Sequence, residues 1–516
     1  MTRHDIVVVG AGLSGAWAAK ELAEAGAKVL LLEAGPEIAR EALAESASVT
    51  WSRDHRPQRQ FIQSQHSAYW EHNPALFVDD LEHPYDTVGD TDFIWIRGRQ
   101  VGGRGLTWGG VTLRFSDFEF KAAALDGFGA QWPFSYADLA PFYDKVETTF
   151  GVCGTTERLP QLPDGIFLTP PPLTEAESRF KLEVESRWKD RKVIHNRGVQ
   201  PDPPHRLPNE SWPRRTVQAR ILPDALRTGN VEVKPDAIAS HLLMDQHGRR
   251  ITGISCVDRR TKSSFVVPAR RVALCASPIE SVRILLNSRH KEHPSGIGNS
   301  SGHLGRSLLD HAAVIMGGNL PGNTHASFQP FGGAHGILVP RFRNIGETRR
   351  EFLRGYGIWG NLGRGHVGDE CPFWTLCAMS EVLPRSDNHM FLHETRTDAW
   401  GIAIPVISLQ YGENERQLLD DAESSLSEMA QTLDWRIGNC LRLPPGAFVH
   451  ELGGARMGSS PASSVLDPYN RCWDTQNLFV LDGSCFVTSG WQNPTLTIMA
   501  IAGRACRTII EELKHG

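Results

Sequence analysis

The stretch DIVVVGAGLSGAWAAKELAEAGAKVLLLEAG, residues 5–35, decides the fold of this chain. It reads as an apolar strand, a glycine turn, a helix and a second apolar strand. Gly10, Gly12 and Gly15 form a GxGxxG motif at the start of the helix. The first glycine of such a motif permits a tight turn, the second lets the backbone approach a pyrophosphate, and the third lets helix and strand pack closely.

Glu33 ends the second strand, near the offset of about 20 residues at which a carboxylate binds the ribose hydroxyls of a dinucleotide. The start of the helix offers free N–H groups to the phosphates. The glycines alone are a weak signal, but together with both strands, the helix and Glu33 they predict a Rossmann-like dinucleotide-binding unit. The motif does not distinguish FAD from NAD.

The composition argues against nucleic-acid-binding, metal-binding and membrane proteins. A length of 516 residues indicates two or three domains, and a formal charge of −5 gives no support for nucleic-acid binding. The nine cysteines show no CxxC pair or zinc spacing, so we expect no metal site. The first strand starts at Asp5 without an apolar leader, and no apolar run approaches the ~20 residues of a membrane helix. We therefore expect a cytoplasmic protein with no membrane partner, whose oligomeric state stays open.

Two blocks near the end of the chain carry candidate chemistry. FVHELGGARMG, residues 448–458, places His450 before a pair of glycines, and SGWQNPTLT, residues 489–497, places Asn493 before a proline. An asparagine followed by proline is typical of a helix start, so we expect Asn493 at the N-cap and Pro494 at the first position of a C-terminal helix.

Six blocks occur together and in a fixed order along the chain. They are GAGLSG with LLEAG (10–35), RGRQVGGRGLTWGG (97–110), ALCASPIESVRILLNS (273–288), LGRSLLDH (304–311), HELGGARMG (450–458) and SGWQNPTLT (489–497). In these blocks the chain resembles the GMC-type (glucose–methanol–choline) flavin oxidoreductases. Within that family it is most similar to the branch of pyranose oxidases and bacterial glycoside 3-oxidases.

The resemblance implies an α/β fold with a Rossmann-like FAD-binding domain and a second, mixed α+β substrate domain. We expect the discontinuous FAD-binding domain to comprise 1–150, 206–311 and 445–516, and the substrate-binding domain to comprise 151–205 and 312–444. Only the region 312–444 is variable in the family, so substrate choice is expected there.

The resemblance also implies FAD as the cofactor. In covalently flavinylated pyranose oxidases a histidine bonds the flavin ring; here that position is Thr107, which predicts non-covalent binding. Val233 matches a position facing the adenine, and Asp482 is as consistent with a turn cap as with a cofactor contact. The implied cofactor-binding residues are Gly10, Gly12, Leu13, Ser14, Gly15, Glu33, Ala34, Arg99, Gly102, Gly103, Thr107, Trp108, Gly109, Gly110, Val233, Ala276, Asp482, Gly483, Asn493, Pro494 and Thr495.

The family assigns the catalytic base to the histidine of the H-x-x-G block, which is His450 here. Imidazole suits this task because its ordinary pKa of ~6.5 lies near working pH. Asn493 takes the second active-site position; an amide can orient a hydroxyl but is no base at neutral pH. Asp310 is expected to cap or anchor a loop, and His311 is interpreted as structural.

These assignments predict oxidation of a secondary ring hydroxyl of a sugar or glycoside to a keto-sugar, at C3 or C2, with O2 reduced to H2O2. The residues 318–376 form a candidate lid, and an open lid over a bulky glycoside favours C3. A sugar or polyol dehydrogenase using a quinone or cytochrome is an alternative, and a non-redox lyase on the same fold is another. The sequence leaves the sugar and the acceptor open.

Overall fold

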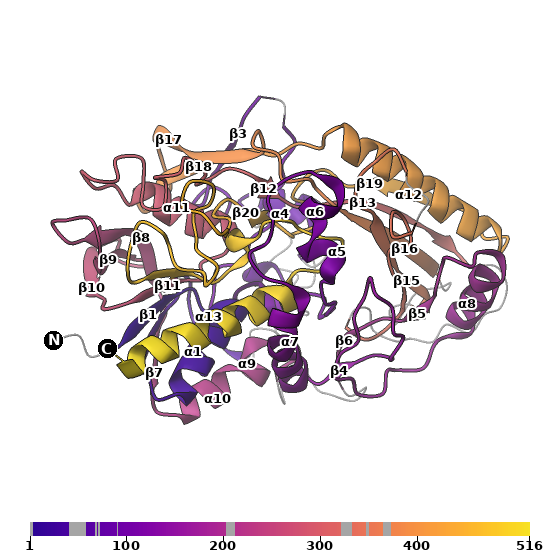
Figure 1. Ribbon diagram of the computed structural model, residues 1–516, viewed down its shortest axis with the longest axis horizontal. Coiled ribbons are helices and arrows are strands. Elements are labelled where there is room, and N and C mark those ends of the chain that lie inside the picture. Colours follow the sequence, from indigo (N-terminus) through magenta and orange to yellow (C-terminus); the bar gives the residue numbers. More distant parts are fainter. Residues whose placement is uncertain are drawn as a thin grey trace.

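The computed structural model describes residues 4–40, 58–67, 70, 73–89, 91–202, 212–320, 333–346, 350–364 and 373–515. Two sheets of different kinds organise these residues, one in each half of an elongated molecule (Figure 1). The predicted lid at 318–376 falls partly outside this set, because 321–332, 347–349 and 365–372 are not described.

The first sheet is parallel and contains the predicted dinucleotide-binding unit. Every residue of its two N-terminal strands is buried, as expected for strands covered on both faces. The strand order places the first strand in the middle, between β11 from the centre of the chain and β2 from the N-terminal unit. The strands in spatial order are β21 (Leu478–Val480), β11 (Val272–Leu274), β1 (Ile6–Val9), β2 (Val29–Leu32) and β7 (Val231–Lys234).

The two ends of the chain pack together beside this sheet. Helix α13 (Thr495–His515) lies against both α1 (Leu13–Glu24) and α7 (Tyr136–Phe150). Figure 1 shows α13, in yellow, running alongside α1. The C-terminal motif block is thereby attached to the N-terminal dinucleotide-binding unit. Two short helices, α9 (Val217–Arg220) and α10 (Leu222–Arg227), complete this layer.

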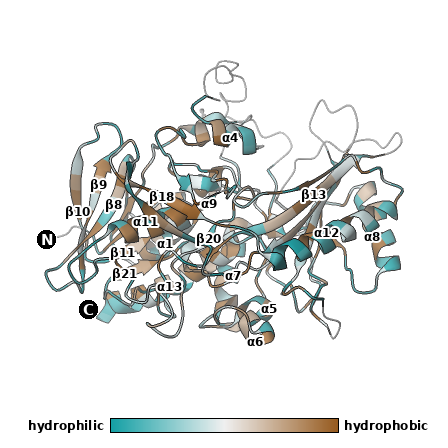
Figure 2. Ribbon diagram, turned by 90° about the horizontal axis from the view of Figure 1, so that it is seen from above, coloured by the Kyte–Doolittle hydropathy of each residue, from teal (hydrophilic) through white to brown (hydrophobic). Residues whose placement is uncertain are grey.

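A small antiparallel sheet extends the parallel sheet at one end of the molecule (Figure 2). Its order is β10 (Ser264–Pro268), β9 (Ile251–Asp258) and β8 (Ala237–Met244). Helix α11 (Pro278–Asn287) packs against β8 and begins with a proline, whose missing N–H is no loss in the first helical turn.

The second large sheet is antiparallel and lies in the other half of the molecule. Helix α12 (Glu413–Gln431) covers it, burying Leu418, Ala422, Leu426 and Met429 from one helical face. Helix α8 (Glu175–Arg187) packs against the same sheet. The strands in spatial order are β19 (Asn439–Arg442), β13 (His311–Asn319), β16 (Phe373–Glu381), β15 (Tyr356–Arg364), β14 (Ile337–Val339) and β5 (Ile194–His195).

Short elements join the two halves. The ladder of β12 (Leu308–Leu309) with β20 (Leu452–Gly453) leads directly into β13. The remaining elements are β3 (Asp86–Thr87), β17 (His389–Thr397), β18 (Ala403–Ser408), β4 (Val152–Cys153), β6 (Gly198–Val199), α4 (Phe61–His66), α5 (Asp117–Phe120), α6 (Ala122–Asp126), η1 (Pro74–Leu76), η2 (Gly103–Leu106) and η3 (Gly483–Cys485).

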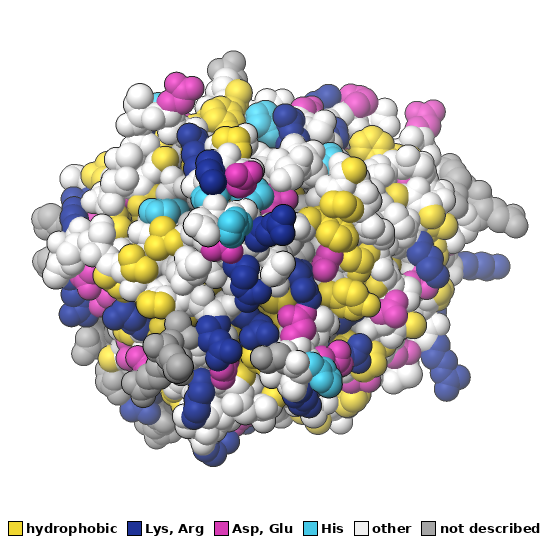
Figure 3. Space-filling model, turned by 60° about the vertical axis from the view of Figure 1, so that its left-hand side comes forward, with side chains coloured by type: hydrophobic (Ala, Val, Ile, Leu, Met, Phe, Trp, Pro, Cys, Tyr) yellow, Lys and Arg dark blue, Asp and Glu magenta, His cyan; other side chains and the backbone are white. Residues whose placement is uncertain are grey.

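The surface carries charges of both signs. On the face drawn in Figure 3, acidic side chains lie among the basic ones, and hydrophobic side chains reach the surface in separate places. Among the described helices, none joins the length and apolar character required to cross a membrane.

Candidate active site

A cavity of about 420 Å³ lies where the predicted motif blocks meet. Its walls come from the β1–α1 turn, the glycine loop at 97–109, the start of α11, the loop at 448–452 and the start of α13. Segments from both ends of the chain, from Val9 to Ile498, thus converge on one space. Its volume is that of an ordinary ligand site.

The β1–α1 turn has the geometry that a dinucleotide requires. A Cβ on Gly10, where φ is +104°, would lie 2.3 Å from the Cys275 carbonyl oxygen, and a Cβ on Gly15 would lie 1.8 Å from the Gly10 oxygen. A Cβ on Gly12, by contrast, meets no atom within 4 Å, and Gly12 lines the cavity. Helix α1 also has no side-chain cap. The free helix start and the open space at Gly12 fit a pyrophosphate.

Glu33 lies at the same end of the cavity. Its carboxylate accepts hydrogen bonds of 2.9 Å from the backbone N–H groups of Ala11 and Gly35. Burial raises the pKa of Glu33, and these hydrogen bonds oppose that rise. A carboxylate has about four acceptor positions, so Glu33 retains acceptor capacity for ribose hydroxyls.

The second glycine loop packs directly on the first. Gly102 donates its N–H to the Ala11 carbonyl at 2.9 Å. A Cβ on Gly103 would lie 3.1 Å from the Cα of Gly12. Both glycines have positive φ, 97° and 52°. Trp108 is anchored in the wall by the hydrogen bond from its Nε1 to the Arg215 carbonyl, 2.9 Å.

Most of the predicted site residues line the cavity. These are Gly10, Gly12, Leu13, Ser14, Glu33, Ala34, Arg99, Gly103, Thr107, Trp108, Gly109, Ala276, His450, Asp482, Gly483, Pro494 and Thr495. Five do not reach its surface: Gly15, Gly102, Gly110, Val233 and Asn493. Gly15 and Gly102 lie behind the wall, where they permit close backbone packing, and Val233 pairs with Leu31 in the sheet.

Asp482 caps the short helix η3, as one of its two interpretations from the sequence expected. Its carboxylate accepts hydrogen bonds from the backbone N–H and hydroxyl of Ser484 at the start of η3, and from the Ser281 hydroxyl of α11. It also lines the cavity. Asp482 thus ties α11 to the C-terminal block beside the space for the cofactor.

The β12–β20 ladder brings two histidines together. Leu309 pairs with Leu452, and continuing this antiparallel register by two residues places His311 opposite His450. The two Nδ1 atoms are 3.2 Å apart, and the rings meet edge to face with centroids 4.9 Å apart. His311, interpreted as structural from the sequence, is therefore in direct contact with the predicted base.

Both rings are held neutral. Burial holds the pKa of His450 well below its ordinary value, and the neighbouring His311 and the positive charge of Arg104 lower it further. Burial lowers the pKa of His311 to about 3, against a small opposing effect of the Gly490 backbone. Two neutral imidazoles in contact through Nδ1 share one proton, so one ring donates and the other accepts.

Asp310 holds the loops on either side of this histidine pair. Its carboxylate accepts a 2.6 Å hydrogen bond from the Gly446 N–H, and its carbonyl accepts one of 3.0 Å from the Ser489 hydroxyl. Burial raises the pKa of Asp310 to about 7. These contacts agree with the loop-anchoring role expected for Asp310.

The start of the last helix differs from the prediction by one residue. Helix α13 begins at Thr495, and the Pro494 carbonyl accepts the hydrogen bond from the Ile498 N–H. Pro494, not Asn493, is therefore the capping residue, and the predicted capping position for Asn493 was wrong. The buried Oδ1 of Asn493 has no hydrogen-bond partner among the described residues. This oxygen lacks a partner, but Asn493 is not among the residues that line the cavity.

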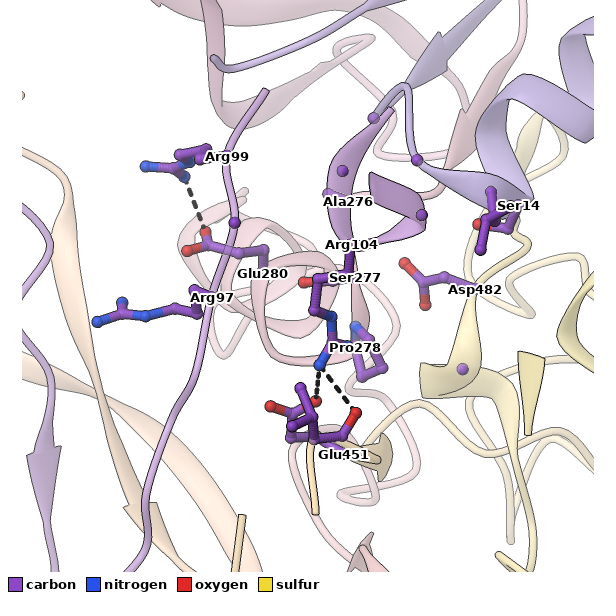
Figure 4. A pocket seen from close by; sticks show the side chains of 18 of the residues that line it. Ser14, Arg97, Arg99, Arg104, Ala276, Ser277, Pro278, Glu280, Glu451 and Asp482 are labelled. Atoms are coloured by element: carbon purple, nitrogen blue, oxygen red, sulfur yellow. Dashed lines mark hydrogen bonds and ion pairs between the residues drawn. The ribbon is translucent and has the colours of Figure 1, made fainter. Parts of the chain in front are cut away.

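The sequence reasoning named Arg99 but missed other charged or titratable residues of the cavity wall, namely His83, Arg97, Arg104, Glu280 and Glu451. Arg99 contacts Glu280 at 3.4 Å and donates to His83 Nδ1 at 2.8 Å. Figure 4 shows this ion pair on one side of the pocket, and Arg104 with Glu451 below it. Arg104 and Glu451 lie within quoted motif blocks, whereas His83 lies in a stretch without any motif.

Fold and site together define a dinucleotide-dependent oxidoreductase. Two models described as GMC oxidoreductase match residues 4–313 and 384–502. The chain therefore belongs to the GMC oxidoreductase family, as the motif order predicted. It is an FAD-dependent oxidoreductase that acts on CH–OH groups.

Three curated relatives match almost the whole chain. The fructose dehydrogenase large subunit of Gluconobacter japonicus is 26% identical and covers 99% of this chain and 98% of its own. The 2-methyl-1,2-propanediol dehydrogenase of Mycolicibacterium austroafricanum is 27% identical, covering 97% and 94%. The C-glycoside 3-oxidase of Microbacterium trichothecenolyticum is 23% identical, covering 99% and 97%.

A solved structure, the formate oxidase of Aspergillus oryzae, is similar over 100% of this chain and 99% of its own, with a TM-score of 0.67 and 15% identity. At that identity the likeness concerns the fold. It confirms the predicted α/β architecture of the family.

Proposed function

We propose that this enzyme oxidises a secondary ring hydroxyl of a pyranose or glycoside, with His450 as the base and Asn493 as the orienting amide. The observation that carries this assignment is the contact between His450, on the cavity wall, and the buried neutral His311. This pair presents an unprotonated imidazole to the cavity at neutral pH.

The position of the hydrogen between the two Nδ1 atoms determines the roles of the two histidines. For Nε2 of His450 to accept the proton of a substrate hydroxyl, its Nδ1 must carry a hydrogen. That hydrogen is donated to Nδ1 of His311 across the 3.2 Å contact. His311 then carries its own hydrogen on Nε2, a buried atom that has no hydrogen-bond partner among the described residues. His311 orients the base without charging it.

The remaining residues of the cavity fit FAD. Bound FAD supplies an acceptor for the hydride that leaves the carbinol carbon. In our proposal the β1–α1 turn holds the pyrophosphate and Glu33 holds the ribose. The start of α13 brings Pro494 and Thr495 to the cavity wall, so the positive end of a helix dipole would stabilise negative charge on a flavin bound there. Such a helix end stabilises negative charge by up to ~2 kcal/mol when partly buried.

Carbohydrate as the substrate class is supported by the similarity to a fructose dehydrogenase and a C-glycoside 3-oxidase. The diol dehydrogenase is equally similar, so similarity alone does not choose a sugar. The segment SEVLPRSDN at 380–388 resembles the pyranose and glycoside oxidase branch, which supports oxidation of a ring hydroxyl and leaves the choice between C3 and C2 open.

We expect turnover with sugars and not with choline or cholesterol. The test is an aerobic assay of D-glucose, methyl β-D-glucopyranoside and a plant C-glycoside for H2O2, with NMR identification of the keto product. Choline, cholesterol and 1,2-propanediol serve as comparison substrates. Turnover of any of these three with none on the sugars would contradict the carbohydrate assignment.

Electron transfer to a quinone or cytochrome is the second candidate, favoured by the two dehydrogenases among the relatives. It predicts slow H2O2 formation but rapid reduction of benzoquinone or a dichlorophenol dye with the same sugar. Conversion of the substrate without any acceptor would instead indicate a lyase.

We also propose the division of labour predicted from the sequence, with 312–444 providing the substrate surface. The β17–β18 hairpin lies within the predicted substrate-binding region 312–444, but it pairs with β3 and packs against α11. This hairpin therefore belongs with the cofactor side of the molecule. The cytoplasmic location stays a prediction.

FAD is expected to be bound without a covalent link. Thr107 lines the cavity at the position where a histidine forms the link in some pyranose oxidases, and a threonine hydroxyl is a poor candidate for that bond. Acid precipitation should release all of the flavin into the supernatant. Flavin that stays with the denatured pellet would contradict this prediction.

A further inference from the structure

An ion pair connects the glycine loop to the loop that carries His450. Nη1 of Arg104, in η2, donates to the Glu451 carboxylate at 2.6 Å and to the Val449 carbonyl at 3.0 Å. One guanidinium nitrogen thus bonds the residues on both sides of His450. The pair joins two loops that lie 347 positions apart in the sequence.

The pair is part of the cavity wall. Both residues line the cavity, and Figure 4 shows the Arg104 side chain directed at Glu451. The Glu451 residue is only 4% exposed, and its second oxygen, Oε1, is buried without a hydrogen-bond partner among the described residues. A buried carboxylate oxygen without a partner is costly unless a ligand supplies a donor.

The backbone held by this pair is strained. Val449 has φ of +65°, a conformation that is rare for a β-branched residue. Such a conformation persists only where surrounding contacts over-determine it. The hydrogen bond from Arg104 to the Val449 carbonyl is one of these contacts.

Four residues with titratable or charged side chains lie around His450: His311 contacts its ring, the charge of Arg104 lowers its pKa, Glu451 follows it in the chain, and Asp310 precedes His311. His311 comes from β13, Asp310 from the turn before β13, Arg104 from η2, and Glu451 from the same loop as His450. The first two are uncharged or partly so near neutral pH, because burial lowers the pKa of His311 to about 3 and raises that of Asp310 to about 7. Arg104 and Glu451 are therefore the positive and the negative member of this set, and they are joined by their ion pair.

We propose that Arg104 and Glu451 are positioning residues for His450, which hold its backbone from both sides and balance the charge around its ring, while the free oxygen of Glu451 binds a hydroxyl or N–H group of FAD. This inference rests on the proposed role of His450 as the base.

The proposal predicts opposite effects of the two charges. Removing the positive charge in Arg104→Met makes protonation of His450 easier, so its pKa should rise by about 1 unit. Removing the negative charge in Glu451→Gln should lower the pKa of His450. The double variant Arg104→Met/Glu451→Gln should return the pKa close to that of the parent. A purely structural role predicts no such opposition.

The pKa can be measured without a substrate. Histidine labelled with ¹³C at Cε1 in the FAD-loaded enzyme gives one NMR signal per ring, and the signal missing from His450→Ala identifies His450. The variants are titrated from about pH 3 to about pH 8, because burial holds the pKa of His450 well below its ordinary value. The matched control is the exposed pair Arg442 and Glu423, 2.7 Å apart on β19 and α12, changed to Met and Gln.

The second readout is FAD affinity, measured by titrating apoprotein with FAD. Glu451→Gln should weaken FAD binding by about 10-fold, the effect of losing one hydrogen bond to a charged group. The control pair should change neither the His450 titration nor the FAD affinity.

The outcomes separate this inference from the proposed function. His450 titration curves that coincide in the parent, Arg104→Met and Glu451→Gln overturn the positioning role. Unchanged FAD affinity in Glu451→Gln overturns the cofactor contact. If Arg104→Met does not fold because it strands a buried carboxylate, Glu451→Gln and the double variant still decide the first point. Failure of the proposed function is seen elsewhere, as unimpaired flavin reduction in His450→Ala.

Discussion

Replacing His450 by alanine is expected to slow anaerobic reduction of the bound flavin by about 10²- to 10⁴-fold, the range typical of losing a general base. The ring is neutral at working pH and contacts His311 through Nδ1, so Nε2 is the atom left to accept the substrate proton. Stopped-flow absorbance with the sugar that reduces the parent fastest measures this rate. FAD content should stay near that of the parent, because most of the cofactor contacts lie elsewhere.

Two further variants serve as a control and as a comparison for His450→Ala. His247→Ala removes an exposed histidine outside the cavity and should leave the rate unchanged. Asn493→Ala should slow the reaction less than His450→Ala, because an amide orients the hydroxyl but does not take its proton. A His450→Ala enzyme that reduces its flavin at the parent rate would rule out His450 as the base.

Gly12→Val is expected to produce a folded protein that has lost its FAD. The new side chain meets no protein atom near its Cβ, so the chain accommodates it, but it projects into the cavity at the start of α1. Displacing the phosphates from the helix N–H groups removes at least two hydrogen bonds to charged oxygens, which corresponds to a loss of about 100-fold or more in affinity. FAD titration of the apoprotein measures the affinity, and circular dichroism reports the fold.

The control for this variant is Gly346→Val, at an exposed glycine whose Cβ also meets no atom within 4 Å. It should keep parent FAD affinity. Gly15→Ala should behave differently from both, because its Cβ would lie 1.8 Å from the Gly10 oxygen and the fold itself must shift. Parent-like FAD binding by Gly12→Val would show that the phosphates lie elsewhere.

The sequence alone determined the family, the cofactor class and the parts of the site that are local in sequence. The β1–α1 turn depends on glycines two and three residues apart and on two short apolar strands, and these are encoded within 30 residues. Fixed spacings of this kind carry their geometry with them. Most of the predicted cofactor residues accordingly line one cavity.

The tertiary structure decided the contacts between segments that are remote in sequence. The register of the β12–β20 ladder brings His311 next to His450. The local sequence LLDH, residues 308–311, does not predict that pairing. The Arg104–Glu451 pair likewise spans 347 positions. Contacts between residues that are remote in sequence depend on how the sheets and loops pack. Sequence spacing therefore does not predict which residues will meet. The environment of the predicted base, including the burial that keeps it neutral, was therefore decided by the fold.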